Sequence, residues 1–130
     1  MPVGILMVSH EGVASPLLAA ARRLVGAMPL AVEAFDVPWD ADADTVLPGA
    51  SAALRKVDGG DGVLLLVDLY GATPARVAER LSRLGTPCHR ISGLSLPMLL
   101  RALNYPEQGL DELARTAAAG ARNGVVIDDA

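Results

Sequence analysis

Aromatic residues are scarce in this sequence, which has one tryptophan, two tyrosines and one phenylalanine among its 130 residues. The hydrophobic fraction of 52% and the charged fraction of 20% nevertheless exclude intrinsic disorder. The core must therefore consist mainly of leucine, valine, isoleucine, alanine and methionine. A chain of this length can bury one such core but not two, so we expect one domain over residues 1–130.

Cysteine, clustered positive charge and long apolar runs are lacking as well. The lone Cys88 can form no internal disulfide, and one thiol with two histidines is too few for a structural zinc site. The net charge is −4 and the arginines are dispersed, which argues against nucleic acid and anionic lipid as partners. The longest apolar runs, such as residues 62–67, are too short to span a membrane. We expect a soluble cytoplasmic protein that needs no metal or cofactor and does not insert into a membrane.

Short apolar segments alternate with helical patterns along the chain. The first and third apolar segments are apolar on both sides, which is typical of parallel strands covered on both faces. The expected strands are Val3–Val8, Leu30–Phe35, Gly62–Val67, Cys88–Ile91 and Val125–Ile127. The expected helices are 17–25, a segment from near Pro48 to Lys56, 74–84 behind a Thr73 cap, 96–103 and 110–121. This order predicts the α/β class, as a three-layer sandwich with a mostly parallel sheet and helices on both faces.

Two polar residues follow the two strands that should be neighbours. In a doubly wound sheet of order 2-1-3-4, the first and third strands lie side by side, and ligands bind at their carboxyl ends. His10 lies just beyond the first strand and Asp68 just beyond the third, so the two side chains should face each other. A carboxylate that accepts a hydrogen bond from Nδ1–H leaves a lone pair on Nε2 and stabilises the cation formed when Nε2 attacks an electrophile. We predict that His10 and Asp68 are the catalytic pair, with His10 as the nucleophile.

A turn of small residues follows Asp68. Gly71, Ala72 and Thr73 precede Pro74 and lead into a helix, whose first N–H groups and positive dipole end suit a phosphoryl group. We therefore assign phosphoryl binding to Gly71, Ala72 and Thr73. Together with the expected catalytic pair, this turn favours phosphoryl transfer.

Simpler interpretations remain open for each feature. A lone histidine near a strand end is more often a structurally hydrogen-bonded side chain than a nucleophile, and an aspartate before a glycine-containing turn is often a cap. We interpret His89, which has no obvious carboxylate partner, as structural, and Cys88 as a small core residue. The aspartates of residues 40–44 do not match a calcium loop, and we interpret them as a solvated turn. A hydrolase triad of Ser9 or Ser15 with His10 and Asp68 is a distant alternative, because the Gly-x-Ser-x-Gly elbow is lacking.

Three segments occur in an order and spacing that point to a known family. They are "VGILMVSHEGVASPLLAAARRLVG" at 3–26, "GVLLLVDLYGATPARVA" at 62–78 and "ISGLSLPMLLRAL" at 91–103. These segments resemble the landmarks of the mannose/fructose-type enzyme IIA domain of the bacterial phosphoenolpyruvate-dependent sugar phosphotransferase system. The resemblance covers essentially the whole chain.

The resemblance implies a role for individual residues. In that family the histidine after the first strand accepts a phosphoryl group on Nε2 from the phosphocarrier protein HPr and passes it to a IIB protein. His10 matches this histidine, Asp68 matches the aspartate that holds it through Nδ1, and Thr73 matches the hydroxyl residue near the phosphoryl group. The Ser-His-Gly or Thr-His-Gly motif of many members is here Ser9-His10-Glu11-Gly12, as it would be with one inserted residue. The implied function is that of a phosphotransferase with a phosphohistidine intermediate, serving sugar uptake or regulation.

Two other functions remain open beside this one. The phosphotransfer subunit of dihydroxyacetone kinase resembles the same fold and uses a corresponding histidine, but its motif after the third strand usually differs from "DLYGATP". A regulatory binding module, whose phosphorylation state is the output, is the second alternative. The sequence contains no fused IIB domain, so we expect separate partners, and it does not reveal which sugar is involved.

The last residues carry a further apolar segment. Asn123 and Gly124 signal the end of the final helix, and three β-branched residues follow at Val125–Ile127. A terminal strand here could pair only with an outer strand of the sheet. In the resembling family this strand is antiparallel and is exchanged between two subunits, which implies a homodimer. A strand that folds back onto its own subunit is the alternative.

Overall fold

Four parallel strands form the central sheet of the computed structural model, which describes residues 2–129. The strands are β1 (Gly4–His10), β2 (Val32–Val37), β3 (Val63–Val67) and β4 (Cys88–Ser92), in the order β2-β1-β3-β4. All three pairings are parallel. The predicted α/β class and the predicted order of these four strands are confirmed.

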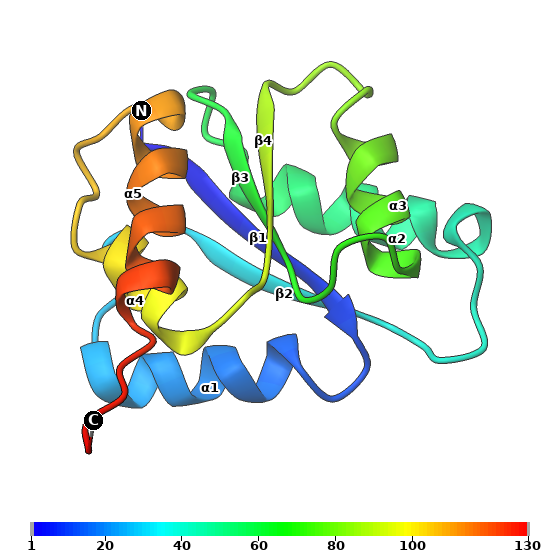
Figure 1. The fold of residues 1–130 in the computed structure, drawn as a ribbon. Coiled ribbons are helices and arrows are strands. Elements are labelled where there is room, and N and C mark those ends of the chain that lie inside the picture. The colour runs from blue at the N-terminus through cyan, green and yellow to red at the C-terminus, as the bar shows by residue number, and fades with distance from the viewer. Residues whose placement is uncertain (1, 130) are drawn as a thin grey trace.

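Between residues 2 and 129, five helices cover the two faces of this sheet. They are α1 (Ala14–Val25), α2 (Ala43–Val57), α3 (Thr73–Leu81), α4 (Leu96–Leu103) and α5 (Leu110–Asn123). One core lies between the sheet and α1, α4 and α5, and a second core lies between the sheet and α2 and α3. Figure 1 shows these two layers on opposite sides of the strands.

The inner strands β1 and β3 supply both cores at once. Ile5 and Leu64 pack among side chains of α1, α4 and α5, whereas Leu6 and Leu65 pack among those of α2 and α3. Because successive side chains of a strand point to opposite faces, a strand covered on both sides must be apolar at every position. The continuous apolar runs of the sequence therefore mark the two central strands.

The starts of three helices differ from the prediction, and α1 begins at Ala14 rather than at Leu17. Helix α2 begins at Ala43 rather than near Pro48, because Asp42 accepts hydrogen bonds from the backbone N–H and the hydroxyl of Thr45. These bonds lower the pKa of the Asp42 carboxyl and satisfy a free donor of the first turn. Pro48 lies only five residues after Ala43, so it removes one hydrogen bond early in the helix and does not end it.

Helix α3 differs at both ends. The residue that caps it is Ala72, which makes no side-chain hydrogen bond, and Thr73 is its first helical residue rather than its cap. The helix ends at Leu81, and the chain continues to Leu84 in tighter turns, in which the N–H of Leu84 donates to the carbonyl of Leu81. The predicted apolar periodicity through Leu84 therefore extends beyond the helix itself.

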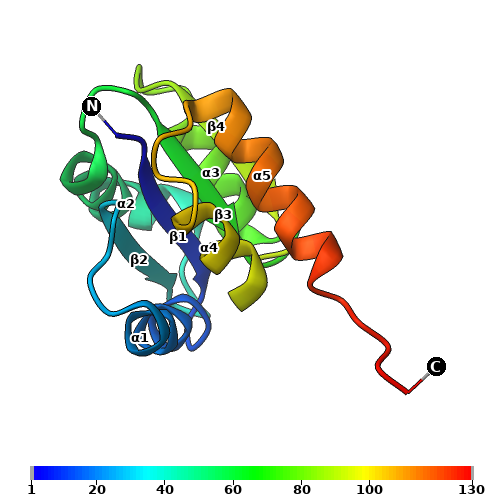
Figure 2. The same ribbon diagram turned by 90° about the vertical axis from the view of Figure 1, so that its left-hand side faces the viewer.

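The predicted terminal strand is not formed in the described chain. Residues 125–127 belong to no strand, and their side chains are 80%, 72% and 75% exposed. Figure 2 shows the segment after α5 running away from the body of the molecule. In residues 2–129, β4 is consequently an outer strand of the sheet, as is β2 at the opposite side. None of the helices in this range has the length and apolar character needed to cross a lipid bilayer.

Candidate functional site

The carboxyl ends of β1 and β3 bring His10 and Asp68 together. Val8 of β1 pairs with Val67, the last residue of β3. His10 is the last residue of β1 rather than the first residue beyond it, and Asp68 directly follows β3. The imidazole Nδ1 lies 2.7 Å from Asp68 Oδ2, and the backbone N–H of His10 donates to the same oxygen over 3.0 Å. The predicted juxtaposition of the two side chains is present in the structure.

The surroundings of Asp68 orient its carboxylate toward the imidazole. Its second oxygen, Oδ1, accepts a hydrogen bond from the backbone N–H of Leu69. The Asp68 side chain is 11% exposed, whereas that of His10 is 20% exposed. A carboxylate that accepts from Nδ1–H selects the tautomer in which Nε2 carries the lone pair. The arrangement can therefore present an uncharged, nucleophilic Nε2 and stabilise positive charge on the ring.

Buried Ser9 shapes the loop after β1 and does not act on the imidazole. Its hydroxyl donates to the carbonyl of His10 and accepts from the backbone N–H of Ala14, each over 2.8 Å. The backbone N–H of Glu11 donates to the carbonyl of Val37 in the neighbouring strand β2. These bonds hold the chain on both sides of His10, and they engage the Ser9 hydroxyl with backbone groups rather than with the imidazole.

The predicted phosphoryl-binding residues enter α3 directly after Asp68. Gly71 has a φ of +84°, a backbone conformation that side-chain-bearing residues rarely adopt, and extended Ala72 then starts the helix at Thr73. The Thr73 hydroxyl accepts a hydrogen bond from the Arg76 guanidinium over 3.0 Å. The first N–H groups of a helix lack acceptors within the helix, so this turn is suited to an anion. Phosphoryl binding by Gly71, Ala72 and Thr73 remains a prediction.

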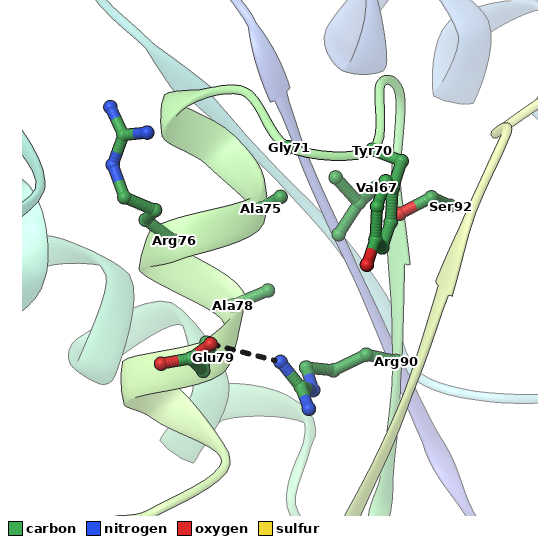
Figure 3. A pocket seen from close by; sticks show the side chains of 9 residues that line it. All are labelled: Val67, Tyr70, Gly71, Ala75, Arg76, Ala78, Glu79, Arg90 and Ser92. Carbon is green, nitrogen blue, oxygen red and sulfur yellow. Dashed lines mark ion pairs between the residues drawn. The ribbon is translucent and has the colours of Figure 1, made fainter.

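A pocket of about 430 Å³ lies beside this turn, between α3 and the strands β3 and β4. Figure 3 shows the ring of Tyr70 over Val67 and Ser92, and Arg90 reaching across to Glu79. The Arg90–Glu79 ion pair spans 3.7 Å. The lining includes Gly71 but neither His10 nor Asp68, so the pocket adjoins the predicted pair without containing it.

Trp39 is the residue of this site that the sequence patterns did not indicate. Its indole stacks on the His10 imidazole, with ring centroids 4.8 Å apart and ring planes inclined by 20°. Trp39 lies just beyond β2, which neighbours β1, and Val37 of β2 pairs with His10. The signal that could have revealed it is positional: it follows a strand that ends at the same edge of the sheet as β1 and β3.

The second histidine has a partner that the sequence did not predict. His89 Nε2 lies 2.6 Å from Oδ1 of Asp111 on α5, although the two residues are far apart in the chain. His89 is therefore an exposed histidine paired with a carboxylate, on the outer strand β4. The neighbouring Cys88 is half-buried, and burial, followed by the charge of Asp58, raises the pKa of its thiol to about 11. The thiol is protonated near neutral pH, which argues against Cys88 as a nucleophile.

The profile of a known protein family, described as "PTS system fructose IIA component", matches residues 4–117. The mannose-specific EIIAB component of the phosphotransferase system of Escherichia coli K12 is 32% identical over 132 aligned positions, which cover 96% of this chain. The chain spans only 39% of the length of that relative. The transcriptional regulatory protein LevR of Bacillus subtilis is 32% identical over 79% of the chain, which corresponds to 11% of LevR.

Solved structures of IIA proteins of the phosphotransferase system have a similar fold. The mannose/sorbose-specific IIA subunit of the phosphotransferase system from Enterococcus faecalis superposes with a TM-score of 0.84 at 25% identity, covering 97% of this chain and 94% of that one. A phosphotransferase system EIIA component from Streptococcus agalactiae has the same fold, with a TM-score of 0.82 at 24% identity and coverage of 98% of both chains. The chain therefore belongs to the mannose-type enzyme IIA family of the bacterial phosphotransferase system.

Proposed function

We propose that the protein is a phosphocarrier that accepts a phosphoryl group on Nε2 of His10. The single observation that carries this proposal is the 2.7 Å contact between His10 Nδ1 and Asp68 Oδ2 at the carboxyl edge of the sheet. It supports the proposal because it leaves the opposite ring nitrogen free to attack. Family membership supplies the reaction class, since IIA components of this system are phosphotransferases.

The proposed reaction requires only the phosphoryl donor, His10 and Asp68. The Nε2 lone pair forms a bond to the phosphorus of the donor, and the phosphorus–nitrogen bond of the donor breaks, with its electron pair left on the donor. The His10 ring then carries a positive charge, and its Nδ1–H remains bonded to the Asp68 carboxylate, which stabilises that charge. In the onward step, a nucleophilic side chain of the acceptor takes the phosphoryl group and His10 returns to its neutral form.

The proposed donor is phospho-HPr, and the proposed acceptor is a IIB protein. The relative from Escherichia coli carries the name of an EIIAB component, which supports a IIB protein as the partner of this domain. The protein would then work in the cytoplasm, as a homodimer. Gly71, Ala72 and Thr73 are the proposed contacts of the phosphoryl group, because they open the helix beside Asp68.

A regulatory output is the second candidate. The match to the transcriptional regulatory protein LevR covers 79% of this chain, which supports a role in which the phosphorylation state of His10 controls another protein. Transfer of the phosphoryl group to a IIB protein would favour transport. A phosphorylated protein that no IIB protein dephosphorylates would favour regulation.

Incubation of the purified protein with enzyme I, HPr and labelled phosphoenolpyruvate tests the proposal. We expect one phosphoryl group per chain, lost in acid and stable in alkali, as for a phosphorus–nitrogen bond. His10→Ala should abolish the label. His89→Ala is the matched control, because His89 is also paired with a carboxylate, and it should retain full labelling. Undiminished labelling of His10→Ala, or an acid-stable group, would overturn the proposal.

A further inference from the structure

The His10 imidazole is fixed at its edge by Asp68 and is also covered on one face. The Trp39 indole lies over that face in a nearly parallel stack, with a centroid distance of 4.8 Å. This distance is within the range of stacked aromatic pairs and within reach of a cation–π contact. A ring that Asp68 holds at Nδ1 can still tilt about that hydrogen bond, and a stacked indole opposes this motion.

Hydrophobic burial does not explain the position of Trp39. It is the only tryptophan of the chain, and it remains 67% exposed, so most of its apolar surface faces solvent. A single exposed apolar side chain is ordinary in a folded protein, so exposure alone says nothing about the role of Trp39. The notable feature of Trp39 is that its indole contacts His10, the side chain to which we assign the role of nucleophile.

The loop that carries Trp39 is held at both ends. At the start of the loop, the carbonyl of Val37 accepts a hydrogen bond from the backbone N–H of Glu11. This bond links the loop to the segment that follows His10. Around Trp39 itself, the N–H of Ala41 closes a turn on the carbonyl of Pro38, and at the end of the loop Asp42 caps α2. The stack therefore rests on an ordered backbone.

We propose that Trp39 is a positioning residue for His10, one that holds the imidazole so that Nε2 points outward and stabilises the positive charge of the phosphorylated ring. The electron-rich face of an indole attracts a cation placed over it, and it attracts a neutral ring less. The contact therefore strengthens as the phosphoryl group arrives. This inference rests on the proposed role of His10 as the phosphoryl acceptor.

Phosphoramidate separates positioning from partner docking. This small donor phosphorylates histidine directly: its phosphorus–nitrogen bond breaks, a bond from phosphorus to Nε2 forms, and ammonia leaves. No protein surface is needed, so a residue that serves only to dock a protein donor does not affect the rate. The variants are Trp39→Ala, Trp39→Leu, which keeps apolar bulk without a ring, and Trp39→Phe, which keeps a ring.

The contact itself is measured first, on the unphosphorylated proteins. The ring current of the indole should shift the nuclear magnetic resonances of the His10 ring protons upfield in the full-length protein, and Trp39→Ala should abolish that shift. Tyr105→Ala is the matched control, because Tyr105 is an exposed aromatic residue in the α4–α5 connection. The residues that follow it line a pocket with Val3, which precedes β1 at the end of the strand opposite to His10. It should leave the His10 resonances unchanged.

Rates and equilibria are measured next, with phosphoramidate and then with phospho-HPr. We expect Trp39→Ala and Trp39→Leu to lower the maximal rate and the equilibrium phosphorylation of His10 by about two- to five-fold, the size of a cation–π contact at an exposed site. Trp39→Phe should recover most of the loss, and KM for phospho-HPr should stay near the wild-type value.

Three results would overturn the inference: no ring-current shift, a Trp39→Leu variant as active as the wild type, or a defect confined to KM for phospho-HPr. Failure of the proposed function looks different. In that case, the wild-type protein takes no phosphoryl group from phospho-HPr, while the effect of Trp39 on the reaction of His10 with phosphoramidate is still measurable.

Discussion

Asp68 combines two tasks in one carboxylate. Its Oδ2 accepts hydrogen bonds from the backbone N–H and from the ring Nδ1–H of His10. Its Oδ1 accepts a hydrogen bond from the backbone N–H of Leu69. The bonds to the backbone place the carboxylate, and the bond to the ring selects the tautomer. In the proposed reaction the negative charge of Asp68 has a separate effect, since it would stabilise the ring after phosphorylation.

Replacement of Asp68 by asparagine separates geometry from charge. We expect Asp68→Asn to fold normally, because an amide can still hydrogen-bond the backbone and the imidazole. Phosphorylation of His10 should be slower by about 10²–10⁴-fold, because the negative charge and the control of the tautomer are lost. Rapid-quench kinetics with labelled phospho-HPr would measure this. Asp111→Asn removes the carboxylate beside His89 and serves as the control, and a wild-type rate in Asp68→Asn would remove Asp68 from the mechanism.

Strand β1 carries His10, the proposed nucleophile, and the first residue of the strand packs directly against the end of α2. A Cβ atom placed on Gly4 would lie 2.0 Å from the carbonyl oxygen of Val57, which is a backbone atom and cannot move aside as a side chain can. The N–H of Gly4 also donates to the carbonyl of Gly62, just before β3. The missing side chain of Gly4 thus lets helix and strand approach closely.

We therefore expect Gly4→Ala to destabilise the fold by about 1–3 kcal/mol, as overpacking in a close-packed interior does. Urea denaturation followed by circular dichroism would measure the free energy of unfolding. Gly109→Ala is the matched control, since a Cβ at Gly109 meets nothing within 4 Å, and the loss there should stay below about 1 kcal/mol. Equal stability of Gly4→Ala and the wild type would contradict the packing explanation.

The molecule as a whole leaves two complementary surfaces without partners in the described chain. Val125, Val126 and Ile127 are largely exposed, and the outer edge of β4 carries no neighbouring strand in residues 2–129. β-branched residues favour extended structure, and an open sheet edge is a template for another strand. These features support the proposal that the segment completes the sheet of a second subunit in a symmetric homodimer.

Light scattering of two chains tests this assembly. The full chain should be a dimer, and a version that ends at Gly124 should be a monomer with the same helical content. Val125→Asp combined with Ile127→Asp keeps the length of the segment and should weaken the dimer as truncation does, because charge opposes burial at a sheet edge. A monomeric full chain, or a truncated chain that dimerises equally tightly, would exclude the exchanged strand as the basis of assembly.

Local patterns determined most of the fold. Continuous apolar runs identified β1 and β3, because only strands covered on both faces need apolar residues at every position. Helix boundaries were less certain, since the cap at Asp42 outweighs the cost of Pro48, and periodicity alone does not show where α3 stops. The segment at 125–127 has the composition of a strand but no neighbouring strand within residues 2–129, and a strand forms only where a partner is present.

The sequence by itself determined the alternation of strands and helices, and with it the meeting of His10 and Asp68. Parallel topology places the carboxyl ends of neighbouring strands at one edge, so two residues 58 positions apart could be paired from the order of strands alone. Only the tertiary structure decided the stack of Trp39 on His10 and the pairing of His89 with Asp111. Both contacts depend on where a loop or a helix surface comes to rest against a strand, and packing across the chain sets that position, not any local pattern of residues.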